Sequence, residues 1–353
     1  MTISAAIAKA KRLGRPLEQQ QLPKWQAPAI DLSDLVLREC HFSGAVLSGA
    51  NLTASKWLNC DLRGTNLQGC QLTGASFIQC QMDAANLCQL DISNCHFIEC
   101  NLQQSHWQRS RFARCSWMQS ALDNSQWQGS VFERCAINGG TSQHIDLAHC
   151  QVLQSAFTRL DLTKANLSGF SADKSVFAGS LLAGQNLAGL ALPRCNFDSV
   201  DFANANLNAA NLAGANLHGA RLTAANLDGI HAPHLLLLDA NLSHCSIRRA
   251  QLGSAMLVKA NISHCDFTAS QLRQSAWDRA CLSTVNCQDA DFGFARFEHC
   301  QGENVDFRHC HFDHARLHGA QFANCRFEGT SLKKTYPTDV ALLAAQQPYL
   351  EQS

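Results

Sequence analysis

Large apolar residues recur at every fifth position through most of the chain. Counted in steps of five from Leu207, the series runs from Leu32 to Leu332 without a slip in frame. Almost every central position carries Leu, Ile, Val, Met, Phe or Trp, with the exceptions Ser142, Ala172, Ala232, Cys287 and Gly302. An α-helix has a period of 3.6 residues and a β-strand a period of 2, so neither explains this spacing. A constant short period predicts a repeat architecture.

The residues around each central position suggest which way each side chain points. Two residues before the central residue lies a small one, as at Ala45, Ala50 and Cys60. The other three positions are mostly polar, and Gly often follows the central residue by two, where a tight turn needs a positive φ. A five-residue unit with two inward side chains and a turn forms one side of a coil. The pattern therefore predicts a solenoid, which has no single globular core.

The repeat is clearest between residues 205 and 222, where Ala-Asn-Leu recurs at Ala205-Asn206-Leu207 and Ala215-Asn216-Leu217. This resembles the pentapeptide-repeat proteins, whose signature is Ala-(Asp/Asn)-Leu-x-x. The resemblance implies an all-β fold, a right-handed quadrilateral parallel β-helix with four repeats per coil. It covers residues 30–334, which leaves 1–29 as an N-terminal leader or cap and 335–353 as a C-terminal cap.

Both caps are expected to contain a short helix. Thr2 to Leu13 has helical apolar spacing and Gly14 as a stop, and Thr338 can cap a helix over 339–347. Val340, Leu342 and Leu343 would then cover the last coil, because an open end exposes unpaired strand edges. The leader is basic, and whether it is a cap or a docking segment stays open.

Charge and cysteine content narrow the functional classes. Lys and Arg number 28, as do Asp and Glu, which argues against a nucleic-acid partner. We find no signal peptide and no apolar run long enough for a membrane span. Most of the 18 cysteines occupy the small inward position, where a thiol replaces Ala as a buried hydrophobe. Reduced cysteines of this kind favour a cytoplasmic location.

No catalytic motif, cofactor fingerprint or metal site is expected. Nucleotide-binding loops and nucleophile motifs are absent from the sequence. His-Cys pairs such as His149-Cys150 place the Cys inward and the His outward, so the two cannot share a zinc ion. The sequence therefore predicts a protein that is not an enzyme.

Interruptions of the repeat are the candidate contact sites. Residues 230–238 combine a Pro with an apolar run and are expected to protrude, with partner-binding residues His234, Leu235, Leu236 and Leu238. A second candidate is the basic group Arg109, Arg111 and Arg114, which lies in a Trp-rich region and suits an acidic partner. Residues 137–143, which contain Gly139 and Gly140, are expected to form a loop or a weak coil.

These features favour a non-catalytic protein-protein interaction scaffold of the bacterial cytoplasm. The leader at 8–17 (AKAKRLGRPL) resembles pentapeptide proteins of type VI secretion clusters, which implies an adaptor or accessory protein whose partner is an effector or a secretion component. One alternative is a DNA mimic that binds gyrase, similar to the quinolone-resistance pentapeptide proteins, although the balanced charge argues against it. Another is a secreted effector that acts on a host. A homodimer is also left open.

Overall fold

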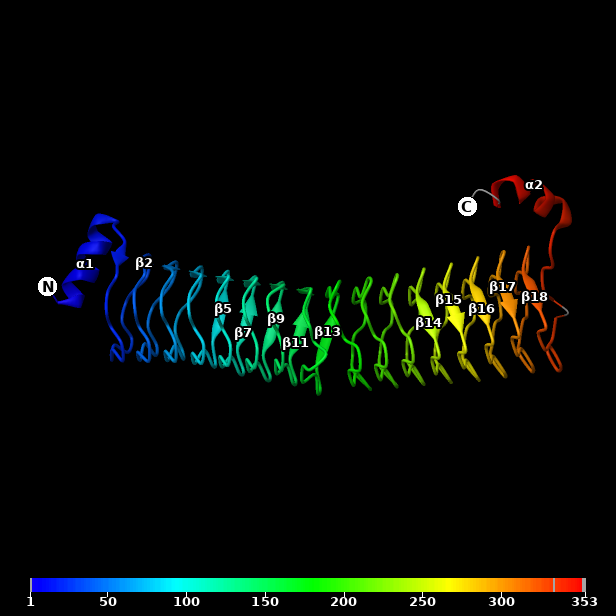
Figure 1. The fold of residues 1–353 in the computed structure, drawn as a ribbon, viewed down its shortest axis with the longest axis horizontal. Coiled ribbons are helices and arrows are strands. Elements are labelled where there is room, and N and C mark those ends of the chain that lie inside the picture. Colours follow the sequence, from blue (N-terminus) through cyan, green and yellow to red (C-terminus); the bar gives the residue numbers. More distant parts are fainter. Residues whose placement is uncertain (1, 333, 351–353) are drawn as a thin grey trace. The chain divides into compact units, whose positions relative to one another are not determined.

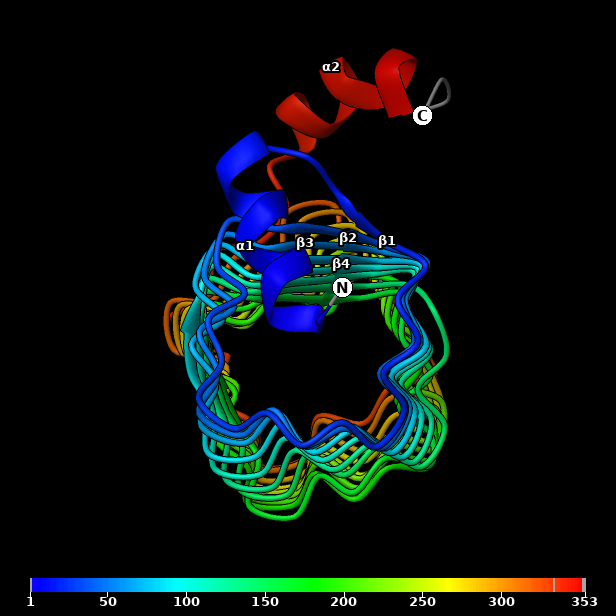
Figure 2. The ribbon, with the colours of Figure 1, turned by 90° about the vertical axis from the view of Figure 1, so that its left-hand side faces the viewer.

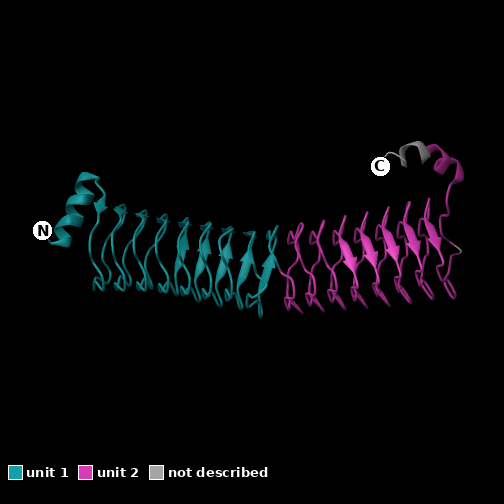
Figure 3. Cartoon of the chain, viewed as in Figure 1, with its two compact units in different colours: residues 1–181 teal, residues 182–353 magenta. Residues whose placement is uncertain are grey.

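The computed structural model describes residues 2–332 and 334–350 and comprises two compact units, Met1–Leu181 and Leu182–Ser353 (Figure 3). Each unit is a stack of coils in which residues twenty apart in the sequence lie side by side (Figure 1). The chain forms an all-β parallel solenoid of about 15 turns with a short helix near each terminus. The predicted fold class is confirmed, and the last three residues of the predicted C-terminal cap lie outside the described residues.

Unit 1 contains helix α1 (Ile3–Leu13) and two parallel sheets. The eight-stranded sheet runs, in order, β1 (Leu17–Glu18), β2 (Val36–Arg38), β3 (Lys56–Leu58), β4 (Ser76–Ile78), β6 (His96–Ile98), β8 (Ser116–Met118), β10 (Ala136–Asn138) and β12 (Ala156–Thr158). The five-stranded sheet runs β13 (Ser171–Asp173), β11 (Gln151–Leu153), β9 (Val131–Glu133), β7 (Arg111–Ala113) and β5 (Asp91–Ser93).

Unit 2 contains one five-stranded parallel sheet and helix α2 (Val340–Leu350). The strands are, in order, β14 (Asn241–Ser243), β15 (Asn261–Ser263), β16 (Cys281–Ser283), β17 (Gln301–Glu303) and β18 (Gln321–Ala323). The other sides of the coils pair through single bridges such as Asn206↔Asn226. The twenty-residue register is therefore kept on the sides that have no named strand.

Hydrogen bonds between successive coils hold the fold together. The Leu47 N–H donates to the Asn66 carbonyl of the next coil (2.9 Å), and the Asn66 N–H donates back to the Ala45 carbonyl (2.9 Å). This exchange recurs on all four sides. Because a buried N–H without a partner is costly, one coil alone leaves its backbone unsatisfied. Each coil is therefore stable only against its neighbours.

The corners between sides explain the Gly-rich position of the repeat. Between residues 19 and 329, every positive-φ residue except Gly140 lies two places after a central residue. Gly, Ala, Asn and Arg all occur there, for example at Gly64, Ala54 and Arg114. The Asx residue before the central one stabilises the turn, because its side-chain oxygen accepts the backbone N–H two residues on, as Asn51 does from Thr53 (3.1 Å).

The first coil begins before the start at residue 30 that we predicted from the sequence. Leu17 pairs with Leu37, and Gln21 and Gln26 pair with His41 and Val46. The sequence already contains the reason, because Leu22 and Leu17 continue the five-residue frame upstream of Leu32.

Helix α1 covers the N-terminal end of unit 1 beside the β1–β4 sheet (Figure 2). It starts at the cap Thr2 and ends at Gly14, whose φ of 60° is left-handed, as the sequence indicated. Ile7 and Ala10 are buried, and Lys11 Nζ lies 2.7 Å from the Asp31 carboxylate. In this structure α1 therefore packs against the first coil of unit 1.

Helix α2 does not cover the last coil as predicted. Val340 is 77% exposed and Leu342 is 47% exposed, while Leu332 of the last coil is 41% exposed. The contacts of the helix include a hydrogen bond from the Asp339 N–H to His318 Nδ1 (3.2 Å) and a contact between Gln346 Oε1 and His318 Nε2 (3.0 Å). These polar contacts place α2 beside His318 and leave Val340 and Leu342 exposed, while Leu343 is half-buried.

Residues 137–143 were expected to form a loop or a weak coil, and the structure shows a coil and no loop. Residues 136–138 form β10, and Gly139 and Gly140 both take positive φ, 63° and 82°. A Cβ at Gly140 would collide with the backbone of Ser120 in the previous coil. The two glycines therefore let the coil continue where it approaches the previous coil closely. A rule based on glycine content alone assigns this segment to a loop.

We predict that Gly140→Ala lowers the free energy of unfolding by more than about 2 kcal/mol, because it adds a backbone collision to left-handed strain. Gly64→Ala is the matched control, since Gly64 also has a positive φ (60°) but has open space around it. We expect the control to cost about 1 kcal/mol. Urea unfolding followed by circular dichroism measures both. Equal losses would show that the Ser120 contact is irrelevant.

The Lys11–Asp31 pair predicts that the docking of α1 depends on pH. The hydrogen bond from Lys11, followed by those from Ser33, lowers the pKa of Asp31 from 3.8 to about 2. Because this pKa is depressed, the contribution is complete above about pH 4 and is lost as the pH falls through about 2. The effect is small, since the Asp31 side chain is 60% exposed.

Hydrogen exchange in α1 tests this prediction. Asp31→Asn should speed hydrogen exchange of the α1 amides at pH 5. In the parent protein, protonation of Asp31 should further speed this exchange as the pH falls from about 4 to about 2, and the variant should lack this increase. Asp34→Asn, an exposed carboxylate in the same coil, should change neither. Acid acceleration that persists in Asp31→Asn would contradict this account.

Candidate protein-interaction surface

One side of the coils, which we call side A, carries unusual outward residues. Its central residues are Leu17, Leu37 and every twentieth residue after them, and in unit 1 it carries the eight-stranded sheet. Beneath the sheet the aromatic central residues stack. Ring centroids are 5.7 Å apart for Trp57 and Phe77, 5.1 Å for Phe77 and Phe97, and 5.6 Å for Phe97 and Trp117. The fully buried rings form a close-packed support for the sheet above them.

The outer surface of this sheet carries four aliphatic residues in a row, which we call the aliphatic stripe. Leu58 pairs with Ile78, Ile78 with Ile98, and Ile98 with Met118, and all four are half-buried. The next side has polar residues at the equivalent positions of the same coils, namely Arg63, Asp83, Gln103 and Asp123. A contiguous apolar row on the outer face of a sheet is a candidate contact surface.

Charged residues of opposite sign border the stripe. Lys56 precedes Leu58 by two residues, and Arg114 lies at the corner that leads into β8. On the opposite edge Glu39 and Glu99 occupy corner positions, where each accepts a hydrogen bond from a Gln of the previous coil (3.0 Å and 2.8 Å). Glu99 follows Ile98 of the stripe, whereas Glu39 lies one coil before Leu58, so the stripe has two basic residues on one edge and one acidic residue on the other.

The predicted basic group lies next to this surface. Arg111 lies on β7 of the side preceding side A, and Arg109 and Arg114 lie at its two corners with φ of 56° and 54°. All three are exposed, and we find no ion pair for them among the described residues. The structure thus joins Arg114 to the stripe, a relation that the sequence analysis did not anticipate.

The predicted protrusion at 230–238 is absent, because these residues form regular sides of a coil in unit 2. His231 pairs with Gln251 and Leu236 with Met256, as the register requires. Leu235 is fully buried in the small inward position and cannot contact a partner, so this candidate was wrong. The Leu run misled the sequence analysis because the inward positions 235 and 237 and the outward positions 236 and 238 are all occupied by the same residue type.

The other candidates of this segment remain accessible. His234 is exposed at a corner, and Leu236 and Leu238 are half-buried on the outer surface. Both leucines belong to side A, because they flank Leu237, a central residue that lies a multiple of twenty residues after Leu17. Met256 and Val258 occupy the equivalent places of the next coil, so unit 2 also has an outward apolar patch in this phase.

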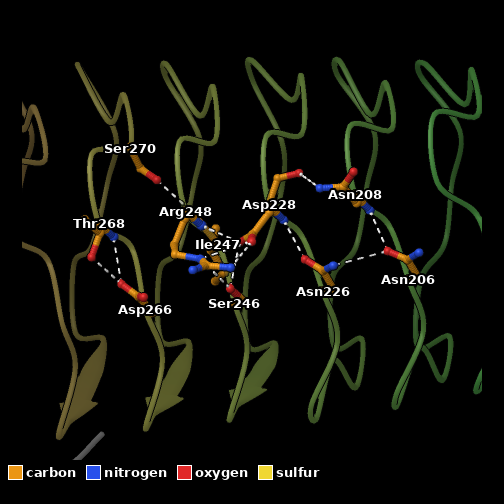
Figure 4. A network of polar contacts seen from close by, with 10 residues as sticks. All are labelled: Asn206, Asn208, Asn226, Asp228, Ser246, Ile247, Arg248, Asp266, Thr268 and Ser270. Carbon is orange, nitrogen blue, oxygen red and sulfur yellow. Dashed lines mark hydrogen bonds and ion pairs between the residues drawn. The ribbon is translucent and has the colours of Figure 1, made fainter.

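Several acidic residues of unit 2 form ion pairs with nearby arginines. Asp228 binds Arg248 (2.6 Å) beside a ladder in which the Asn226 amide donates to Asn206 (3.3 Å; Figure 4). Similar ion pairs join Asp278 to Arg296 (2.6 Å), Asp291 to Arg273 (3.3 Å) and Asp306 to Arg308 (2.7 Å). The bond from Arg308 holds the pKa of Asp306 at about 2. Asp228, Asp278, Asp291 and Asp306 therefore present paired charges.

The cysteines have a structural role. All 18 are free, and Cys40, Cys60 and Cys80 lie in one file with each Sγ near a backbone carbonyl of the preceding coil. Burial raises the pKa of Cys70 to about 11, which keeps its thiol protonated and unreactive. Within the described part of the chain, no group of three or more His, Cys, Asp or Glu is arranged to hold a metal ion. No helix among those residues is long and apolar enough to cross a membrane.

Models of one protein family match most of the repeat. The model described as a pentapeptide repeat region matches residues 18–87 and 70–147, and that of pentapeptide repeats (8 copies) matches 192–229, 237–274, 280–319 and 303–336. The chain belongs to the pentapeptide-repeat proteins. The sequence resemblance is thereby confirmed.

Solved pentapeptide-repeat structures resemble this one at low sequence identity. HetL of Nostoc sp. strain PCC 7120, involved in heterocyst differentiation regulation, is 15% identical over 95% of this chain and 97% of its own, with a TM-score of 0.18. Full-length QnrB1, a plasmid-mediated fluoroquinolone resistance protein, is 12% identical over 64% of this chain and 96% of its own, with a TM-score of 0.20. These similarities concern the fold alone. No curated protein matches the chain.

The sequence analysis missed the aliphatic stripe, although a signal for it exists. An aliphatic residue directly follows an aromatic central residue in Trp57-Leu58, Phe77-Ile78, Phe97-Ile98 and Trp117-Met118, always twenty residues apart. The five-residue frame does not show this pattern. It becomes visible only when residues twenty apart are compared, because each coil has four five-residue sides and equivalent sides recur at that interval.

The packing beneath side A contains one unsatisfied donor in this pentapeptide-repeat protein. Trp57, Trp107, Trp127 and Trp277 each donate an indole N–H to a Ser two residues earlier, at 2.7 or 2.8 Å. Trp117 has Cys115 in that place, and its Nε1 has no partner although it is buried. An unpaired buried donor lowers stability.

We therefore predict that Cys115→Ser raises the free energy of unfolding by about 1 kcal/mol, because the new hydroxyl can accept the Trp117 N–H. Ser125→Ala, which leaves the Trp127 indole without its acceptor, should lower it by about 1–3 kcal/mol. Chemical unfolding followed by tryptophan fluorescence measures both. A Cys115→Ser protein that is less stable than the parent would refute this pairing rule.

Proposed function

We propose that this pentapeptide-repeat protein is a non-catalytic protein-interaction scaffold and that each unit has a contact surface on its own side A. One observation carries the proposal. The outward-facing apolar clusters of both units, the aliphatic stripe in unit 1 and the Leu236, Leu238, Met256 and Val258 patch in unit 2, belong to the same phase of the twenty-residue period. Exposed apolar side chains on a rigid sheet face are typical of protein-binding surfaces.

The finer proposal is an adaptor for secretion effectors in a bacterial cytoplasm. The resemblance of residues 8–17 to the leaders of type VI secretion-associated pentapeptide proteins supports it, and Lys9, Arg12 and Arg15 of this leader are exposed. The buried free thiols support a reducing compartment. A gyrase-binding DNA mimic needs a continuous acidic surface, and the Asp–Arg pairs of unit 2 do not favour one.

Co-purification from a bacterial lysate, at low and moderate salt and followed by mass spectrometry, tests the proposal. We expect the full-length protein to retain a secretion effector or spike component at moderate salt, since apolar contacts resist screening. The variant Leu238→Ser/Val258→Ser should retain at least about tenfold less of it, because both side chains lie on the outer surface.

Leu153→Ser is the matched control, since Leu153 is 37% exposed on the outer surface of β11, which lies on another side. Equal capture by all three proteins would exclude the side A patch of unit 2 as the contact surface. Recovery of gyrase that is lost as salt rises would replace this proposal by the DNA-mimic alternative.

A further inference from the structure

We propose that the aliphatic stripe of unit 1 binds an amphipathic α-helix of a partner protein, with the helix axis along the direction in which the coils stack. The inference rests on the proposed scaffold function and specifies the partner. It concerns Leu58, Ile78, Ile98 and Met118, which none of the sequence-based candidates included.

The spacing of the stripe matches that of a helix. Neighbouring parallel strands lie about 4.8 Å apart, so the three intervals from Leu58 to Met118 span about 14 Å. A helix advances about 5.4 Å per turn, so about twelve residues cover the stripe. Apolar residues at i, i+4, i+7 and i+11 then lie over successive stripe residues. The mismatch of about 0.6 Å per turn accumulates to only about 2 Å over this length.

An extended strand is a poorer occupant of this surface. A strand binds by adding to a free sheet edge, through unpaired N–H and carbonyl groups. Within the stripe these groups are already used, since Ile78 and Ile98 each pair with a coil on both sides. Recognition must therefore occur through side chains on the sheet face, where the ridges of a helix offer the larger apolar contact.

The platform is rigid, which favours binding. The stacked rings of Trp57, Phe77, Phe97 and Trp117 support the strands from inside. Binding to a preformed surface loses little conformational entropy. Unit 1 also packs against a helix at its N-terminal end, where α1 buries Ile7 and Ala10 and its Lys11 forms an ion pair with Asp31.

The two borders define the charges of the partner helix. Lys56 and Arg114 lie on one edge, where acidic residues of the helix would lie, and Glu99 lies on the other, where a basic residue would lie. Reversing the helix direction exchanges its flanks. Electrostatic complementarity therefore selects one of the two directions, while the apolar row supplies most of the affinity.

Binding of a designed helix to the full-length protein tests the proposal. The probe is a fluorescein-labelled, hydrocarbon-stapled peptide of about sixteen residues, with Leu at i, i+4, i+7 and i+11, Glu on one flank and Lys on the other. Fluorescence anisotropy should show saturable binding with a Kd of about 10 μM. A peptide of the same composition with scrambled Leu positions should not bind.

Protein variants locate the binding site. Ile78→Thr/Ile98→Thr keeps β-branched residues on the strands and should weaken binding by at least about tenfold. Leu153→Thr on the outer surface of β11 should leave binding unchanged, and Lys56→Glu/Arg114→Glu should weaken it about threefold to tenfold at low salt. Circular dichroism and thermal unfolding confirm that each variant is folded.

The outcomes separate this inference from the scaffold proposal. No saturable binding to the parent protein, or equal binding to the Ile78→Thr/Ile98→Thr variant, overturns the helix proposal. If that variant still captures the same partner from a lysate as the parent does, the scaffold function stands and the stripe is not its helix site. If the peptide binds as expected but no protein partner is captured, the scaffold function fails instead.

Discussion

The parallel hydrogen-bond ladder between successive coils determines most of the structure. Every coil donates to and accepts from its neighbours at a register of twenty residues, as Leu47, Asn66 and Ala45 illustrate. An insertion that is not a multiple of five would move a central residue out of the core, which explains why the frame never slips between Leu32 and Leu332. The same ladder places equivalent residues of successive coils in straight rows. Surface rows, including the aliphatic stripe, are therefore a direct consequence of the backbone register.

The fold could be predicted from the sequence because the signal repeats so many times. The central frame, the small inward position and the positive-φ corner all correspond to buried or left-handed residues in the structure. The sequence-based predictions failed where the same residue type occurs in two different structural roles. Gly139 and Gly140 allow a tight backbone approach within a coil, although glycines also mark loops. The Leu235–Leu238 run occupies inward and outward positions alternately, so composition alone gave Leu235 the wrong role.

The proposed contact surface was harder to find in the sequence for a related reason. A pentapeptide frame treats all four sides of a coil as equivalent, and only a comparison at intervals of twenty residues separates them. Seen at that interval, Leu58, Ile78, Ile98 and Met118 form one row, and Arg114 lies beside it instead of belonging to a separate basic patch. The terminal helices depend on tertiary contacts as well. Helix α1 buries Ile7 and Ala10, whereas α2 leaves Val340 and Leu342 exposed.

Hydroxyl-radical footprinting of the full-length protein, alone and with its co-purified partner, tests the role of side A most directly. Outward aliphatic and thioether side chains react in the free protein, and a bound partner shields those that it covers. The account predicts that oxidation of Met118 and Ile98, or of Met256 and Val258, falls when the partner binds, while that of Leu153 on another side does not change. Shielding of Leu153 with full reactivity at Met118 and Met256 would contradict the assignment of side A as the interaction surface.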